Sequence, residues 1–313
     1  MREAKQIPKG ARRKKMIVGT LLVLLFAFLL LVGIFAVLAS YVPEFTGQCV
    51  AVVEINAPLT TGGSPTTLMS MGYPSSEQLA YEIRQLNERP DVGSVLFVIN
   101  SGGGSVVATH EVYEAIEDVD KPRVSYFREV AASGAYYISS GSDYIISEPT
   151  ALTGSIGVVA STMSMAGLFE KVGIDAEDIT SGENKDMGSV YGNLTSEQRD
   201  IIQGMVDEIF QDFKNIVIEN RGNKLNRNKI DEIFDGRIMT GRQALSYGLV
   251  DATGNKRDAL MKAAELGGIE AERPEDVRVC YITIVPSEGG LFSANTFLGP
   301  IEESLNIPSI GYK

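Results

Sequence analysis

The pattern of apolar and polar positions divides the chain into one long uncharged stretch and an alternating body. Residues 16–43 contain no charged side chain and are dominated by Leu, Val, Phe and Ala. A helix needs about 20 apolar residues to cross the hydrocarbon core of a membrane. The stretch therefore predicts a transmembrane anchor over 16–42, with Tyr41 at the membrane interface.

The residues before this stretch predict its orientation. Residues 1–15 carry seven Lys or Arg side chains and a single acid, Glu3, which marks the cytoplasmic side under the positive-inside rule. We therefore expect a single-pass protein of the cell membrane with a cytoplasmic N-terminus and an extracytoplasmic body. A cleaved signal peptide stays open as an alternative, because Val37-Leu38-Ala39 is close to a small-x-small cleavage pattern. Against it, the apolar stretch exceeds the roughly 7–15 residues of a signal peptide.

After a linker at 43–48, short apolar runs alternate with helical patterns. Runs rich in β-branched residues predict strands at 49–55, 92–100, 123–127, 144–147, 156–161 and 277–284, with an extended segment at 178–181. Spacing and capping residues predict helices at about 76–87, 106–117, from 133 onward, 165–172, 194–221, 227–234, 240–247 and 256–266. This alternation indicates an α/β fold with a mainly parallel β-sheet covered by helices. The domain is expected to span 49–285, followed by a Gly-, Pro- and Ser-rich tail at 286–313.

Composition narrows the classes of function. The 313 residues are 44% apolar and 22% charged, which suits a folded core and excludes a disordered tail protein or a disulfide-stapled mini-protein. Beyond residue 15, the 21 basic and 39 acidic residues leave a net charge of −18, so we expect no nucleic-acid partner. One His and two Cys without a CxxC pair support neither a metal site nor a cofactor. A Cys49–Cys280 disulfide would fit an extracytoplasmic body, but the sequence does not bring the two together.

Three segments carry candidate chemistry. The first, Asn-Ser-Gly-Gly-Gly-Ser at 100–105, joins a strand to a helix and can present backbone N–H groups to an oxyanion; the same loop can also be an ordinary turn. In the second, Ser133 lies among small residues between a strand and a helix, where it can be a nucleophile or only a helix N-cap. In the third, Lys185 lies in a polar loop, by default as a solvated surface charge.

Together these segments resemble the bacterial signal peptide peptidases of the SppA family, Ser-Lys peptidases related to the Clp protease/crotonase fold. The matching motifs are INSGGGSV at 99–106, VAASGAYYIS at 130–139, EPTALTGSIGVV at 148–159, SGENKDMGS at 181–189 and GRIMTGRQALSYGLVD at 236–251. Their order and spacing agree over roughly residues 48–265, and the length suits the short form of the family. Gly102 is a departure, since the family commonly has Pro there.

The resemblance implies a role for each matched residue. Ser133 is expected to be the nucleophile and Lys185 the general base. Gly134, with Gly103 or Gly104, is expected to supply the N–H groups of an oxyanion hole.

Other residues are expected to support this pair. By the resemblance, Ser155 would orient the lysine amine. A free lysine amine is protonated at neutral pH, so we expect Lys185 to be buried in an apolar site, with Glu183 and Asp186 turned away. A Ser-Lys mechanism needs no imidazole, and His110 is expected to be a partly exposed helix residue.

The interpretation is a membrane-anchored serine endopeptidase that degrades hydrophobic peptides such as cleaved signal peptides. The resemblance also implies a homo-oligomeric ring in which Ser133 and Lys185 come from adjacent chains. Two alternatives stay open: a crotonase-like acyl-CoA enzyme and a catalytically inactive membrane scaffold. The sequence gives neither the cleavage-site preference nor the oligomer number, and it leaves open whether the anchor is retained and what the tail does.

Overall fold

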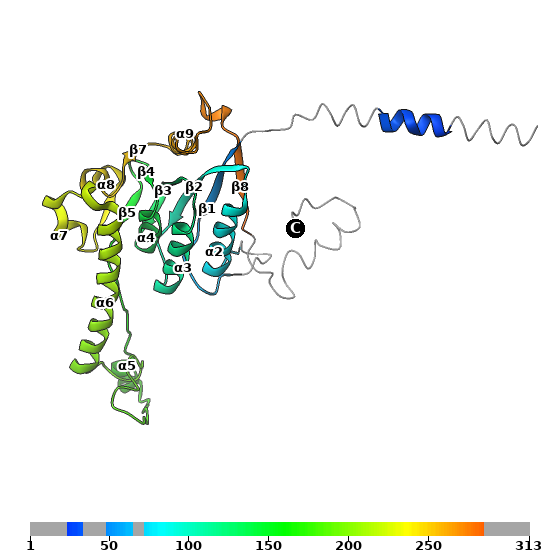
Figure 1. Ribbon diagram of the computed structural model, residues 1–313. Coiled ribbons are helices and arrows are strands. Elements are labelled where there is room, and N and C mark those ends of the chain that lie inside the picture. The colour runs from blue at the N-terminus through cyan, green and yellow to red at the C-terminus, as the bar shows by residue number, and fades with distance from the viewer. Residues whose placement is uncertain (1–23, 34–47, 65–71, 285–313) are drawn as a thin grey trace, which may run out of the picture. The chain divides into compact units, whose positions relative to one another are not determined.

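The computed structural model describes residues 24–33, 48–64 and 72–284, which belong to two separate units, 1–47 and 48–313 (Figure 1). In the first unit a helix at 24–33 lies within the expected anchor at 16–42. Among the described residues, no helix is both long and apolar enough to span a membrane. The basic segment at 1–15, the rest of the anchor, most of the linker at 43–48 and the tail at 286–313 lie outside the described residues.

The strands of the second unit form one sheet. They run in the order β6-β5-β3-β2-β1-β8, and β4 pairs with both β3 and β7 beside this path. All pairs are parallel except β5 with β6, so the mainly parallel sheet expected from the sequence is confirmed. The strands are β1 (Cys49–Ile55), β2 (Val92–Ser101), β3 (Arg123–Ala132), β4 (Tyr144–Ser147), β5 (Leu152–Gly154), β6 (Ile238–Thr240), β7 (Ala252–Thr253) and β8 (Val279–Ile282).

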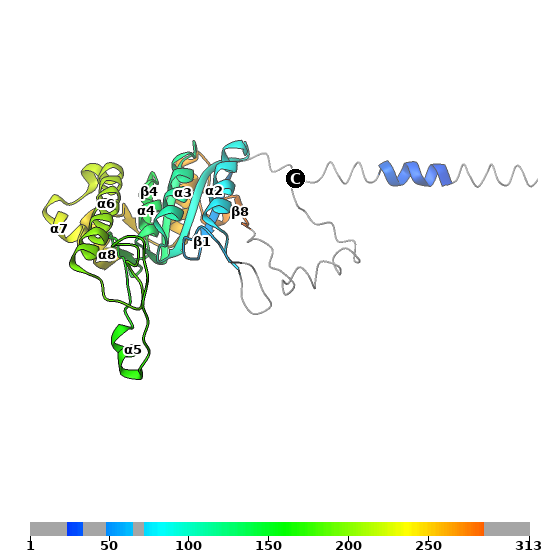
Figure 2. The ribbon, with the colours of Figure 1, turned by 90° about the horizontal axis from the view of Figure 1, so that it is seen from below.

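Helices lie on both faces of the sheet (Figures 1 and 2). The α-helices are α2 (Ser76–Gln85), α3 (Val106–Glu117), α4 (Gly134–Ser140), α5 (Ala166–Val172), α6 (Ser196–Arg221), α7 (Ile230–Ile233), α8 (Gly241–Tyr247) and α9 (Lys256–Leu266), with 3-10 turns at Leu86–Glu88, Gly222–Lys224, Arg227–Lys229 and Pro274–Asp276. Successive strand residues point to opposite faces. Val53 and Phe97 therefore pack with α2 and α3, while Val52 and Leu96 pack with the alanines of α9.

The observed elements correct two of the expected ones. The segment at 156–161 is not a strand; the strand is Leu152–Gly154, directly before it. The chain leaves the sheet at Ser155, whose φ is 50°, and Val159 is 84% exposed. The segment at 178–181 forms no strand either. The sequence also missed β5, β6 and β7, because strands of two or three residues are too short to show a period.

The chain between the sheet and α6 forms an arm, defined here as residues 159–195. It projects from the sheet together with the first half of α6 (Figure 1). No residue from 159 to 197 is buried. Val159, Met163 and Ile179 are 84%, 65% and 94% exposed. The arm is therefore held by few contacts within its own chain.

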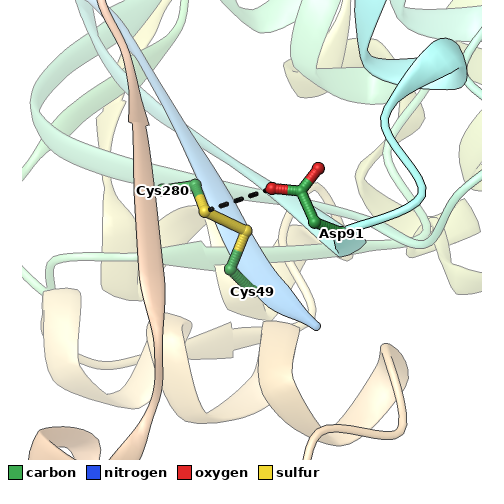
Figure 3. Close-up of side chains that lie close together, drawn as sticks. All are labelled: Cys49, Asp91 and Cys280. Atoms are coloured by element: carbon green, nitrogen blue, oxygen red, sulfur yellow. Dashed lines mark hydrogen bonds between the residues drawn. A yellow bond between two sulfur atoms is a disulfide. The ribbon is translucent and has the colours of Figure 1, made fainter. Parts of the chain in front are cut away.

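The parallel pairing of β1 with β8 brings the two cysteines together. Cys49 and Cys280 form a disulfide with a Cα–Cα distance of 5.9 Å (Figure 3). The Asp91 carboxylate lies 4.0 Å from Cys280 Sγ. Because the disulfide leaves neither sulfur as a thiolate, these three residues do not offer a ligand set for a metal ion.

Candidate active site

Ser133 occupies a strained turn between β3 and α4. It is the N-cap residue of α4, with φ 56° and ψ −126°. A residue other than glycine with positive φ costs on the order of 1–3 kcal/mol and persists only where its surroundings fix it. Here the Ser133 N–H donates to Gly154 O at 2.9 Å, and Ser133 O accepts from the Tyr137 N–H at 3.0 Å. These contacts hold the serine at the end of a central strand, half-buried.

The glycine loop lies against this turn. A Cβ on Gly103, whose φ is +95°, would come within 2.6 Å of Gly134 N. A Cβ on Gly134 would lie 2.4 Å from Thr109 Oγ1 and 3.3 Å from Gly104 N. Only glycine allows the two backbones to approach so closely. The loop therefore lies directly beside Ser133.

The hydrogen bonds of the loop distinguish its two candidate donors. The Gly103 N–H donates to Ser101 Oγ at 3.1 Å. Leu59 pairs with the loop by donating to Gly103 O and accepting from the Ser105 N–H, both at 2.9 Å, and the Gly104 N–H takes no part in this pairing. Gly134 is the first residue of α4, where an N–H has no partner within the helix. Gly104 and Gly134 thus offer the N–H groups for a developing oxyanion.

Ser155 lies next in register to Ser133. β5 pairs with the end of β3, with Ala132 opposite Gly154. The residues that follow are Ser133 and Ser155, and both have positive φ. The Ser155 N–H donates to Arg237 O at 2.8 Å. The structure thus brings the expected nucleophile and the expected lysine-orienting serine to the same edge of the sheet.

A cavity of about 130 Å³ opens beside Ser133. Three helices supply most of its wall, and their lining residues follow helical spacing. The lining residues are Gly104, Val106, Thr109, His110, Ser133, Gly134, Tyr137, Gly157, Val158, Val159, Ile209 and Phe213. Most of them were not identified from the sequence. The i, i+3, i+4 spacing of 106, 109 and 110 on a helix next to the glycine loop was the available signal.

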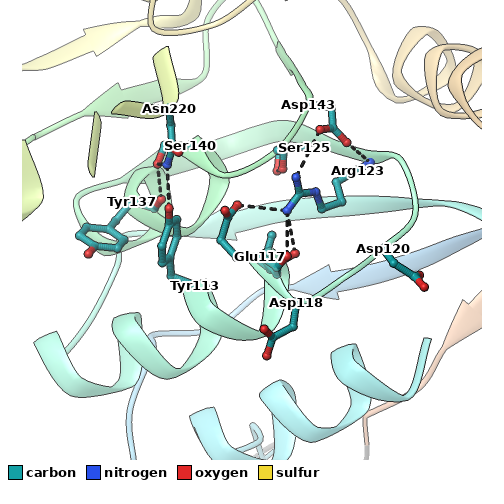
Figure 4. Close-up of polar contacts among 12 residues, drawn as sticks. Tyr113, Glu117, Asp118, Asp120, Arg123, Ser125, Tyr137, Ser140, Asp143 and Asn220 are labelled. Atoms are coloured by element: carbon teal, nitrogen blue, oxygen red, sulfur yellow. Dashed lines mark hydrogen bonds and ion pairs between the residues drawn. The ribbon is translucent and has the colours of Figure 1, made fainter. Parts of the chain in front are cut away.

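Aromatic side chains pack behind this cavity. The Tyr137 ring lies 5.1 Å from the Tyr113 ring, 4.9 Å from the Phe213 ring and 5.2 Å from the His110 ring, measured between centroids. Asn220 of α6 donates to Tyr113 Oη and to Ser140 Oγ, both at 3.0 Å (Figure 4). Burial raises the pKa of Tyr137 to about 12. The tyrosine is therefore neutral at ordinary pH, as a wall of the cavity.

His110 is partly exposed on α3, as expected from the sequence. It is nevertheless not remote from the serine, because it lines the same cavity as Ser133. Its Nε2 lies 3.4 Å from the Tyr137 hydroxyl.

Lys185 lies away from this cavity within its own chain. It is exposed, in the turn of the arm at 182–189, and it is not among the cavity's lining residues. Gln198 of α6 is 5% exposed and donates to Asp186 Oδ1 at 3.0 Å and to Glu183 O at 3.4 Å. The Asp186 carboxylate is thus engaged by Gln198. The single chain does not bury Lys185, and its burial in the competent enzyme stays a prediction.

A buried ion pair fixes the base of α6. Arg221, the last residue of α6, is 2% exposed and donates two hydrogen bonds of 3.0 Å to Asp251. Its Nε donates to Gly248 O at 3.1 Å. Burial alone would raise the pKa of the Asp251 carboxyl, but the hydrogen bonds and charge of Arg221, with a contribution from Lys224, hold it below its ordinary value.

Comparison with known proteins gives consistent matches. Residues 115–270 match the model of peptidase family S49. A protease of Methanocaldococcus jannaschii is 37% identical over 216 residues, 68% of this chain and 67% of that protein. A protein of Enterococcus faecium named signal peptide peptidase SppA is 34% identical over 211 residues, 66% of this chain and 60% of that protein.

Two further matches are a longer curated protein and a solved structure of low sequence identity. Protease 4 of Salmonella typhi is 30% identical over 231 residues, 73% of this chain and 36% of that protein. The matched region thus spans about two thirds or less of the curated relatives. Among solved structures, a membrane-bound stomatin-specific protease matches with a TM-score of 0.45 and 15% identity, over 76% of this chain and 99% of that one.

Proposed function

The chain belongs to peptidase family S49, a serine peptidase family, and we propose that it is an endopeptidase that degrades hydrophobic peptides such as cleaved signal peptides. One observation carries the proposal. Ser133 lies in a strained turn beside the N–H groups of Gly104 and Gly134, and it lines a cavity together with the apolar side chains of Val106, Ile209 and Phe213.

In the proposed reaction, Ser133 Oγ attacks the carbonyl carbon of the scissile bond while Lys185 Nζ accepts the hydroxyl proton. The Gly104 and Gly134 N–H groups stabilise the resulting oxyanion. When the tetrahedral intermediate collapses, the C–N bond breaks and the lysine gives its proton to the leaving amine. Water then hydrolyses the acyl-enzyme by the same route and frees the serine. Ser155 would orient the lysine amine, and no cofactor takes part.

Lys185 can act as the base only in surroundings that keep its amine uncharged. A lysine amine is neutral at ordinary pH only when it is buried in apolar surroundings, and Lys185 is exposed within its own chain. We propose that the arm of one copy lies on a neighbouring copy, so that Lys185 reaches the Ser133 of that copy within a ring. The exposed Val159, Met163 and Ile179 of the arm support this proposal, because they would be covered by such a contact.

Complementation tests the shared site. Ser133→Ala and Lys185→Ala proteins are each expected to be inactive. When they are mixed under conditions that let subunits exchange, activity should return, because the serine of one variant meets the lysine of the other. Mixed oligomers that form and stay inactive would reject the shared site.

The substrate assignment follows from the cavity and from a relative's name. Val106, Ile209 and Phe213 supply the apolar part of the cavity wall, and the Enterococcus faecium relative is named for signal peptides. Peptides rich in Leu and Ala should therefore be cut faster than peptides rich in Asp and Glu. Equal rates for the two kinds of peptide would refute the signal-peptide assignment but not the peptidase function.

We also propose that residues 16–42 anchor the protein in the cell membrane, with the catalytic domain on the extracytoplasmic side. The uncharged stretch and the basic residues before it support this. The Cys49–Cys280 disulfide agrees, since disulfides persist mainly in oxidising compartments. Protease accessibility in intact cells tests it: cleavage of residues 49–284 from the outside is expected, and protection until lysis would refute it.

Active-site labelling separates the peptidase from its alternatives. A fluorophosphonate probe should label the purified chain, and Ser133→Ala should abolish both labelling and peptide hydrolysis. Ser142→Ala is a matched control from the same domain, because Ser142 is buried in a hydrogen bond with Ser125. Turnover of acyl-CoA with no peptide hydrolysis would favour the crotonase-like alternative. Absence of both reactions would favour the inactive scaffold.

A further inference from the structure

The loop that carries the Gly104 N–H contains three consecutive glycines, Gly102, Gly103 and Gly104. Glycine has the widest choice of backbone conformations of any residue, so this stretch has little stiffness of its own. A donor stabilises an oxyanion best when it already points at the place where the charge develops. The direction of the Gly104 N–H must therefore be fixed by contacts that the glycines make with other residues.

The backbone of Leu59 fixes part of this loop. Its N–H donates to Gly103 O, and its carbonyl accepts from the Ser105 N–H, both at 2.9 Å. Leu59 is itself well anchored, because its side chain is buried in the hydrophobic core. This pairing holds the carbonyl of Gly103 but makes no bond to the Gly103 N–H.

Ser101, the last residue of β2, holds the Gly103 N–H. Its Oγ accepts from that N–H at 3.1 Å and donates to Gly103 O in a longer contact of 3.5 Å. A serine hydroxyl bonded to the backbone two residues further on is a common way of fixing a turn. Ser101 is 4% exposed and pairs with Ala131 of β3, two residues before Ser133. Its hydroxyl therefore ties the glycine loop to the strand pair that carries the nucleophile.

The conformation of Gly103 sets the direction of the next peptide group, which contains the Gly104 N–H. Gly103 has a φ of +95°, and Gly104 N lies 3.3 Å from the position of a Cβ on Gly134. Rotation of the backbone at Gly103 would turn the Gly104 N–H away from Gly134. Ser101 is not among the residues that line the cavity beside Ser133, so its hydroxyl acts on the loop and not on the substrate.

From these contacts we propose that Ser101 is a positioning residue of the peptidase. Its hydroxyl fixes the backbone of Gly103 and so directs the Gly104 N–H at the oxyanion that forms when Ser133 attacks. The inference rests on the proposed peptidase function, and it adds a buried side chain that never touches the substrate to the residues on which the rate depends.

Ser101→Ala in the full chain tests this role, because it removes the hydroxyl and leaves every glycine in place. We expect kcat for a Leu- and Ala-rich peptide to fall by about tenfold, less than the roughly 10²–10³-fold loss on deleting an oxyanion donor. KM should stay within about threefold, since the oxyanion exists only in the transition state. A peptide aldehyde, which forms a tetrahedral adduct with a serine, should lose affinity by about the same tenfold.

Rescue and control variants separate positioning from a merely structural role. Ser101→Thr keeps a hydroxyl and should restore kcat to within about threefold of wild type. Ser94→Ala removes another buried hydroxyl of β2, which donates to Ala263 O at 2.6 Å; it should lower the melting temperature but leave kcat within about twofold. Ser105→Ala changes an exposed side chain of the same loop that makes no capping hydrogen bond, and it should change neither.

The outcomes distinguish this inference from the function beneath it. If Ser101→Ala keeps the wild-type kcat and aldehyde affinity, or if Ser94→Ala lowers kcat equally, the role of Ser101 is refuted and the peptidase stands. A folded Ser101→Thr protein as slow as Ser101→Ala would also refute it. If Ser101→Thr does not fold, the aldehyde affinity of Ser101→Ala decides. If wild-type protein neither reacts with fluorophosphonate nor cuts peptides, the proposed function fails and the role of Ser101 fails with it.

Discussion

Removing the guanidinium of Arg221 should destabilise the fold far more than removing an exposed one. In Arg221→Met, the two hydrogen bonds to Asp251 and the one to Gly248 O are lost. The Asp251 carboxylate stays behind with a side-chain exposure of 9%. Breaking a buried ion pair on one side costs about 3–5 kcal/mol, because the remaining charge is buried without its partner.

The remaining partners of Asp251 reduce this cost. Lys224 Nζ lies 2.8 Å from Asp251 Oδ1, and the Ile145 N–H donates to Asp251 Oδ2 at 2.9 Å. We therefore expect the lower end of the range, about 3 kcal/mol. The assay is equilibrium urea denaturation followed by circular dichroism, at one protein concentration because oligomerisation would shift the apparent stability.

Arg84→Met is the matched control. Arg84 donates to Asp118 at 2.8 Å, but the two side chains are 42% and 57% exposed. Exposed pairs contribute about 0–1 kcal/mol, so this variant should lose at most about 1 kcal/mol. Equal losses for Arg221→Met and Arg84→Met would refute the argument that burial sets the cost.

The pH dependence gives a second check on the same pair. The pKa of the Asp251 carboxyl is lower in the folded protein than in a free side chain. Its contribution to stability is therefore complete above the unfolded pKa, about 3.9, and is lost as the pH falls through the folded value. The cost of Arg221→Met should be largest near neutral pH and shrink below about pH 4. A cost that stays constant would contradict the assigned pKa direction.

Three further predictions concern other parts of the domain. Gly104→Ala should abolish peptide hydrolysis and lower the melting temperature, because its Cβ would lie 1.9 Å from Leu59 O; full activity would refute the loop geometry. Cys280→Ser should lower the free energy of unfolding by about 2–5 kcal/mol under oxidising conditions, and reductant should cancel the difference from wild type. Gln198→Ala should lower kcat more than the exposed control Gln203→Ala, because Gln198 holds the turn that carries Lys185; equal kcat values would count against that turn's role.

Local sequence patterns predicted most of the fold because each depends on neighbouring residues. The bounds of β1, α3 and α9 agree with the expected 49–55, 106–117 and 256–266. A β-branched run accounts for β1, the capping box of Asn255 and Asp258 for the start of α9, and the helical spacing of apolar residues for α3. Short β5 and β6 could not be predicted in this way, since β5 pairs with the end of β3 and β6 pairs with β5.

The sequence also identified the candidate catalytic residues, while only the tertiary structure decided which of them are neighbours in space. Motif order pointed to Ser133, the glycine loop and Lys185. The parallel pairing of β2 with β3 brings Gly104 to Ser133, and the packing of α3, α4 and α6 makes the cavity with His110 in its wall. The same packing leaves Lys185 exposed on the arm. Contacts between residues far apart in the chain depend on how several elements pack together, so a local sequence pattern cannot predict them.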